Sequence, residues 1–220
     1  MESINCKIVS WNEIEKWTRN VASQIRKEGF APEICIGLTR GGWIPSRLIC
    51  DHLRIKDLHS VKTEHWGITA TKDGEAKLAA PLTVEIAEKR ILLVDDITDT
   101  GQSMKLAFEH ARSKGSADVR SATLLHIAHS KFKPDFYALE VPAAEWTWFI
   151  FPWNFNEDIQ SLVHKTLADG AKGDGEIMEL LKKHCKITVD DDVIRDTLAE
   201  LAKRREVVRS QGKWHRNKVD

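Results

Sequence analysis

Apolar and polar positions along the first part of the chain change repeatedly between helical spacing and short buried runs. A capping box at Ser10 and Glu13 is followed by apolar side chains at helical spacing, which predicts a helix to about Lys27. The apolar run at 34–38 has the pattern of a buried strand. A second helix is expected over about 43–53.

The same alternation continues to about residue 128. After the polar loop expected over 67–80, the spacing of Val84 and Ile86 predicts a short strand. Four successive apolar residues within 90–96 predict a central strand that is buried on both faces. The remaining expected elements are a strand over 58–66, the polar loop over 67–80, a helix over 101–114 and a strand over 119–128. Strands that alternate with helices predict an α/β fold with a parallel sheet, in which ligands bind at the carboxyl ends of the strands. The loops 39–42 and 95–103 both lie at such ends.

The pattern changes after an aromatic segment at about 142–155. Three helices are expected over about 157–168, 175–185 and 190–205, and a β-hairpin over 206–214. Three helices and a hairpin outline a winged-helix-like α+β appendage. We therefore expect two domains, 1–156 and 157–220.

Composition excludes several classes of protein. The 220 residues contain 33 basic and 33 acidic side chains, so no overall charge directs the chain to nucleic acid or to an anionic membrane. No apolar stretch is long enough to span a membrane, and the N-terminal sequence lacks the pattern of a signal peptide. Four scattered cysteines suit free thiols in a reducing compartment, so a cytoplasmic protein is expected.

The loop 95–103, Asp-Asp-Ile-Thr-Asp-Thr-Gly-Gln-Ser, carries the strongest chemical signal. Asp95 and Asp96 end the central strand, and a turn rich in hydroxyl groups and glycine leads into a helix. A helix N-terminus offers unpaired N–H donors and a positive dipole end, which suit a phosphate. The carboxylates suit sugar hydroxyls or a magnesium ion. The lysine of a P-loop is missing, which argues against an ordinary nucleoside triphosphatase.

The run 91–101 resembles the signature motif of type I phosphoribosyltransferases. The resemblance implies a parallel sheet flanked by helices with a small hood, and binding of Mg²⁺ and phosphoribosyl pyrophosphate (PRPP). It implies catalytic roles for Asp95 and Asp96, which hold the ribose diol and, at Asp96, the metal, and for Asp99, near N7 of the base. The residues implied to bind PRPP are Thr39, Arg40, Gly41, Asp95, Asp96, Thr98, Asp99, Thr100, Gly101, Gln102 and Ser103.

Two further segments resemble parts of the same enzymes. The segment 37–45 is similar to the pyrophosphate loop, in which Arg40 and a glycine backbone hold the leaving group. The segment 146–153 is similar to the base-binding hood of xanthine-guanine and archaeal hypoxanthine-type purine phosphoribosyltransferases. This resemblance implies that Trp148 stacks on the purine and Phe149 contacts its edge, beside Asp99.

The chain departs from these enzymes at one position. They place a lysine that recognises the 6-oxo group directly after the strand that here ends at residue 128, and this chain offers Lys131 or His129 as alternatives. The loop 67–80 matches their mobile loop, with Lys72 or Lys77 as candidate phosphate contacts.

The predicted function is transfer of ribose 5-phosphate from PRPP to a 6-oxopurine (hypoxanthine, guanine or xanthine), with release of pyrophosphate, in purine salvage. One alternative is an adenine-specific transferase. Another is a PRPP-binding transcriptional regulator, because the tail is basic and carries Lys203, Arg204, Arg205, Arg209, Lys213, Arg216 and Lys218 against Glu206 alone. A nucleic-acid partner is the less favoured reading of this tail, which can also be a dimerisation module of a homo-oligomer; no membrane partner is expected.

Overall fold

A computed structural model describes residues 2–65 and 76–217, and every structural statement below refers to these residues. The chain forms two compact units, Trp11–Trp146 and a second unit that combines Met1–Ser10 with Thr147–Asp220. This division differs from the boundary expected near residue 156. Strand β8 (Trp148–Ile150) pairs in parallel with β1 (Cys6–Ile8), which ties both ends of the chain into the second unit.

The first unit is built on a six-stranded sheet with the order β4-β3-β2-β5-β6-β7. All neighbouring strands are parallel except β3 and β4. The strands are β2 (Ile34–Thr39), β3 (Asp57–His65), β4 (Ala76–Ala80), β5 (Arg90–Thr98), β6 (Asp118–Ile127) and β7 (Phe136–Val141). The mostly parallel α/β sheet predicted from the sequence is confirmed.

The prediction of a strand at Val84 and Ile86 is wrong. This segment has no regular structure, and the extra strand is β4, inside the region expected to be a polar loop. Ile86 is fully buried in the same core cluster as Leu82, so the apolar spacing reflects the burial of an irregular connection. Strand β7 was not expected from the sequence at all.

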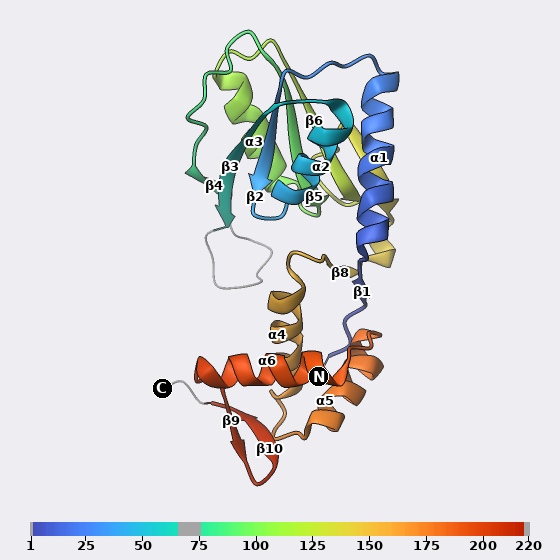
Figure 1. The fold of residues 1–220 in the computed structure, drawn as a ribbon, viewed down its shortest axis with the longest axis vertical. Helices are drawn as coiled ribbons and strands as arrows, with labels where there is room; N and C mark the ends of the chain where they lie inside the picture. The colour runs from blue at the N-terminus through green and yellow to red at the C-terminus, as the bar shows by residue number, and fades with distance from the viewer. Residues whose placement is uncertain (1, 66–75, 218–220) are drawn as a thin grey trace. The chain divides into compact units, whose positions relative to one another are not determined.

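Helices cover both faces of the sheet, α1 (Trp11–Lys27) and α2 (Trp43–Leu53) on one face and α3 (Gln102–Ser113) on the other (Figure 1). The alternation of side chains along a strand explains this arrangement. On β5, Ile91 and Leu93 join the core cluster under α3, whereas Leu92 and Val94 join the cluster under α1 and α2. The four successive apolar residues therefore fill two cores at once.

The order of the strands places a topological switch point between β2 and β5. From β2 the chain passes through α2 to β3 on one side, and from β5 it passes through α3 to β6 on the other side. In open α/β sheets this is where ligands bind, outside the carboxyl ends of the strands. The loops after β2 and β5 both begin there.

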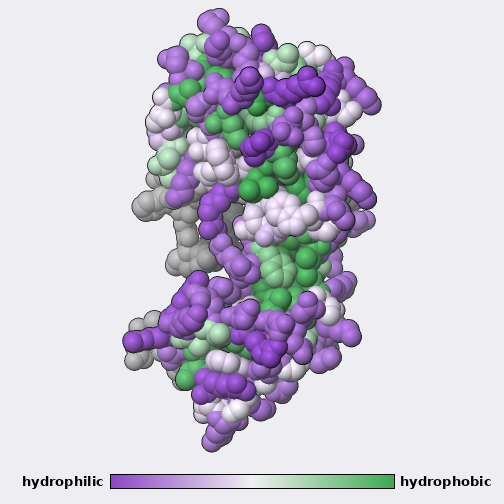
Figure 2. All heavy atoms as spheres, in the orientation of Figure 1, coloured by the Kyte–Doolittle hydropathy of each residue, from purple (hydrophilic) through white to green (hydrophobic). Residues whose placement is uncertain are grey.

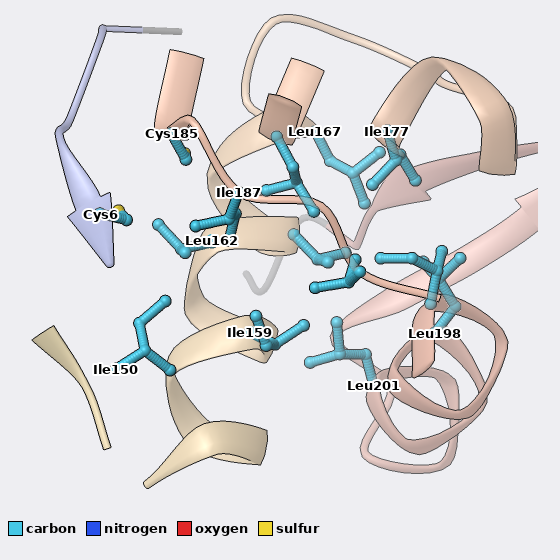
Figure 3. Close-up of a cluster of buried hydrophobic side chains, with 14 of the residues drawn as sticks. Cys6, Ile150, Ile159, Leu162, Leu167, Ile177, Cys185, Ile187, Leu198 and Leu201 are labelled. Carbon is cyan, nitrogen blue, oxygen red and sulfur yellow. The ribbon is translucent and has the colours of Figure 1, made fainter. Parts of the chain in front are cut away.

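The second unit contains three helical segments and a hairpin, close to their expected positions. They are α4 (Phe155–Thr166), α5 (Asp174–Leu180) with a π-helical turn (Leu181–Cys185), α6 (Asp191–Lys203), and the antiparallel pair β9 (Val207–Ser210) and β10 (Lys213–Arg216). Ile159 and Leu162 of α4 pack with Leu198 and Leu201 of α6 in a single core, which Cys6 and Cys185 border (Figure 3).

The visible surface of both units is mostly hydrophilic, with smaller hydrophobic areas between the polar side chains (Figure 2). None of the described helices has the length and apolar character needed to cross a membrane.

Candidate active site

The loop after β2 lies directly against the buried carboxylate of Asp96. A β-carbon at Gly41 would overlap this carboxylate, with Cγ of Asp96 only 2.6 Å away. The loop turns tightly, because the N–H of Gly42 donates to the carbonyl oxygen of Leu38 at 2.8 Å. The two loops predicted to share a site are therefore in contact.

Asp95 and Asp96 lie within β5, which runs two residues beyond the predicted end and pairs with β6 as far as Thr98. Asp96 is buried, and Asp95 is partly buried with its Oδ1 accepting the N–H of Asp96 at 3.0 Å. Burial, followed by the neighbouring Asp96 charge, raises the pKa of Asp95 well above its ordinary value. A free protein therefore holds two adjacent carboxylates at a site where negative charge is unfavourable.

A cradle for an anion follows at the start of α3. Gly101 adopts φ +79° and precedes the helix, whose first turn carries no acidic side chain. The hydroxyl oxygen of Thr100 lies 3.4 Å from the N–H of Gln102. A cavity of about 200 Å³ is lined by Asp95, Ile97, Thr98, Asp99, Thr100, Gly101, Gln102, Ser103 and Met104. Exposed N–H groups, hydroxyls and the helix dipole all favour a phosphate in this cavity.

Behind the cradle, a buried histidine that the sequence analysis missed supports Thr98. Nδ1 of His126 lies 3.0 Å from the hydroxyl of Thr98, and both side chains are almost completely buried. Burial lowers the pKa of His126, so the ring is favoured in its neutral form. A polar residue inside the apolar run 124–127 was the signal that could have revealed it.

The turn after β6 adds a second histidine. His129 reaches Asp99, with Nε2 at 2.6 Å from Oδ1. The sequence had offered His129 and Lys131 as alternatives for one position. His129 makes the contact with a predicted site residue, while the backbone N–H of Lys131 donates to the carbonyl oxygen of Thr100 at 3.2 Å.

Trp148 and Phe149 belong to the second unit, on β8. The indole N–H of Trp148 donates to Asp158 at 3.2 Å, and Nζ of Lys165 lies 4.6 Å from the ring centroid. Trp148 also packs against the core of this unit. Its ring is thus held in one orientation by α4, with one face covered by a cation. Phe149, the next residue on the strand, is partly buried.

Two predicted phosphate contacts cannot be placed. Lys72 lies outside the described residues, and only the backbone of Lys77, on β4, is described. Within the described ranges, no group of three or more His, Cys, Asp or Glu side chains is arranged to hold a metal ion by itself.

Comparisons with known proteins agree with this geometry. Residues 7–160 match the family described as phosphoribosyl transferase domain. A xanthine-guanine phosphoribosyltransferase of Cereibacter sphaeroides is 29% identical over 159 residues, covering 66% of this chain and 85% of the relative. A second enzyme of that name, from Idiomarina loihiensis, is 27% identical over 149 residues, covering 67% and 86%.

Among solved structures, a purine phosphoribosyltransferase from Pyrococcus horikoshii has the same fold. Its TM-score is 0.58 at 23% identity, and the match covers 68% of this chain and 94% of that one. A xanthine-guanine-hypoxanthine phosphoribosyltransferase from Helicobacter pylori gives 0.58 at 20% identity, covering 71% and 99%.

The raised pKa of Asp95 predicts how the stability of the free protein depends on pH. Between the ordinary aspartate pKa and the raised value, the folded protein holds a proton that the unfolded chain releases, so the free energy of unfolding falls as pH rises through this window. Asp95→Asn removes the carboxylate, and we expect it to stabilise the protein at pH 7.5 by roughly 0.5–2 kcal/mol, and by much less at pH 4. Urea unfolding without PRPP or Mg²⁺ measures both values.

The exposed Asp51, which lies 3.7 Å from Arg47, provides the control. Asp51→Asn is expected to leave the urea midpoint unchanged at both pH values. If Asp95→Asn raised the free energy of unfolding equally at pH 4 and pH 7.5, the destabilisation would not come from ionisation of Asp95.

Proposed function

We propose that this chain, which belongs to the phosphoribosyltransferase family, transfers ribose 5-phosphate from PRPP to a 6-oxopurine and releases pyrophosphate. The observation that carries the proposal is the contact of Gly41 with the Asp96 carboxylate, beside the anion cradle of 98–103. It brings a pyrophosphate loop, a diol-binding carboxylate pair and a phosphate cradle to one switch point of the sheet. PRPP contains all three complementary groups.

Each element then has a defined task. The backbone of Gly41 and the Arg40 guanidinium hold the pyrophosphate, and Thr39 shapes the loop between them and β2. Asp95 and Asp96 bind the ribose diol. The 5′-phosphate is held by the first turn of α3, through Gln102 and Ser103, and by the loop residues Thr98, Thr100 and Gly101.

Substitution at the anomeric carbon develops oxocarbenium character, as in glycoside chemistry. The protein lowers the barrier by holding charged groups around the sugar before the reaction begins. As N9 of the purine bonds to C1′, the C1′–O bond breaks and both of its electrons leave with pyrophosphate. The imidazole ring loses its N7 proton in the same transfer, and Asp99 is the acceptor that we assign.

The carboxylate pair also fits a magnesium ion that arrives with PRPP. Mg²⁺ binds through one or two carboxylates together with substrate phosphates and water. The raised pKa of Asp95 supports this assignment, because a nearby positive charge would offset the cost of ionising two adjacent, buried carboxylates. We assign Asp96 as the protein ligand of such an ion, which would supply positive charge next to the pyrophosphate.

On the base side, we assign stacking to Trp148 and an edge contact to Phe149. The rigid support of the Trp148 ring by Asp158 and Lys165 favours this role, because a ring held in advance loses little freedom on binding. The names of the relatives from Cereibacter and Idiomarina support a 6-oxopurine over adenine.

A transcriptional regulator that binds DNA through the second unit is less well supported. The exposed side of α6, the recognition helix of a winged-helix arrangement, carries Asp191, Asp192, Asp196 and Glu200. Its basic residues are neutralised by these acids, since Arg195 pairs with Asp192 and Lys203 with Glu200. In the hairpin, Lys213 lies 3.3 Å from Glu176. DNA phosphates would meet a face that is acidic overall.

We therefore assign the second unit, with its winged-helix-like set of helices and hairpin, to packing within a homo-oligomer. Exposed Trp43 and Trp146 of the first unit offer apolar surface for such an assembly. The four buried cysteines are free thiols, which suits a cytoplasmic enzyme.

Pyrophosphate release from Mg-PRPP tests the function directly. We expect turnover with hypoxanthine, guanine or xanthine, and little with adenine. Turnover with adenine alone would keep the transferase and overturn the choice of base. Tight PRPP binding without turnover on any base would overturn the transferase and favour the regulator.

Gly41→Ala tests the contact between the two loops. The new methyl group must displace the Asp96 carboxylate, which is buried and has little room to move, so we expect kcat/KM for PRPP to fall about 100-fold. Gly175→Ala is the matched control, because no atom lies within 4 Å of its added methyl group. Equal kcat/KM for Gly41→Ala and wild type would show that the loop is not held against Asp96.

Trp148→Leu tests whether the Trp148 ring stacks on the purine. Loss of an aromatic platform costs about 1–3 kcal/mol per base, so KM for the purine should rise roughly 5- to 150-fold while KM for PRPP changes little. Trp148→Phe keeps a ring without the bond to Asp158 and should recover most of the affinity. The exposed Trp146 provides the matched control, and Trp146→Leu should leave both KM values unchanged. A Trp148→Phe variant as weak as Trp148→Leu would argue for a packing role only.

A further inference from the structure

His129 and Asp99 form a hydrogen-bonded pair where β5 and β6 end. Nε2 of His129 and Oδ1 of Asp99 are 2.6 Å apart. A carboxylate can only accept, so the histidine nitrogen is the donor. The two side chains are 42% and 43% exposed, so each is also open to a substrate.

The backbone fixes this pair from both sides. The N–H of Ser130 donates to the carbonyl oxygen of Ile127 at 2.9 Å, which closes a tight turn with His129 inside it. The N–H of Lys131 then donates to the carbonyl oxygen of Thr100, directly after Asp99. The two loops touch again at Gly101, where a β-carbon would lie 2.5 Å from the hydroxyl of Ser130.

The pair occupies only one oxygen of the carboxylate. Among residues 2–65 and 76–217, Oδ2 of Asp99 has no hydrogen-bond partner. Asp99 also borders the anion cavity. The hydrogen bond from His129 therefore holds one oxygen of the carboxylate and leaves the other available to a ligand.

We propose that His129 is a positioning residue that orients Asp99 toward the purine through this hydrogen bond. The proposal rests on the proposed function, in which Asp99 accepts the N7 proton. A carboxylate that rotates freely samples many orientations, and one that is held by a neighbour is ready for the transfer in advance. In this role His129 acts through Asp99 and requires no contact of its own with the base.

The pair of His129 and Asp99 is expected to contribute little to the free energy of unfolding. Exposed ion pairs contribute little to folding, because water already solvates both groups and their side chains lose freedom on pairing. The turn around His129 is closed by backbone hydrogen bonds that do not involve its ring. Removal of the ring should thus leave the fold intact and affect only the orientation of Asp99.

Steady-state kinetics of three variants test this role. We expect His129→Leu to lower kcat about 10- to 100-fold, with KM for PRPP within about twofold of wild type and an unchanged urea midpoint. His129→Gln retains an N–H donor and should recover kcat to within about threefold of wild type. In an Asp99→Asn background, His129→Leu should have no further effect, because both changes disable one unit.

His59 provides a matched control, since its Nε2 also lies 2.6 Å from a carboxylate, Oδ1 of Asp57, at a similar exposure. It lies at the start of β3, and His59→Leu should leave kcat unchanged. Wild-type kcat in His129→Leu would overturn the proposal, as would a His129→Gln variant as slow as His129→Leu, or independent effects in the double variant. Failure of the proposed function itself is distinct, since wild type would then release no pyrophosphate with any purine.

Discussion

The close approach of the loop after β2 to the carboxylate of Asp96 is the contact on which the site depends. It requires a residue without a side chain at Gly41, a strand that carries Asp96 into a buried position, and two parallel strands that are neighbours without being consecutive. Each requirement has its cause in the sequence. The apolar runs of β2 and β5 bury both strands in two cores, and this burial fixes the ends of the strands to within the short distance that the contact needs.

The same burial makes the site costly. Asp95 lies beside Asp96 with little solvent, and its raised pKa expresses the unfavourable ionisation of two adjacent carboxylates. The sheet tolerates this because the surrounding core is large, and a ligand that brings positive charge or sugar hydroxyls relieves it. Binding sites commonly contain groups that destabilise the free protein, and the packing of the rest of the fold offsets this cost.

The sequence was sufficient for strands β2, β3, β5 and β6 of the sheet and for the positions of the two loops, because their signals are local. It did not reveal the edge strands β4 and β7. Apolar runs identified β2, β5 and β6, and the residues Asp95, Asp96 and Gly101 announced their chemistry by type and order. Ile86 misled the prediction, since periodicity reports burial and cannot separate a strand from an irregular buried segment. The boundary near residue 156 failed to anticipate the pairing of β8 with β1, a contact between distant parts of the chain. The bond from His129 to Asp99 could not be selected for the same reason, although His129 had been a candidate. His126 did have a local signal, a polar residue inside an apolar run, and it was overlooked.

The chemistry of α6 bears on what the second unit does. A basic tail was the reason to consider nucleic acid, but the count of charges along a sequence ignores their partners. Once folded, Arg204 donates to Glu200 at 3.0 Å, and Arg209 lies 5.4 Å from the ring centroid of Trp214. These cations are engaged within their own unit, and the acidic residues of α6 lie where a DNA backbone would need positive charge. Several basic residues of the tail therefore find partners within their own unit, which weakens the argument from sequence charge alone for a polyanionic ligand.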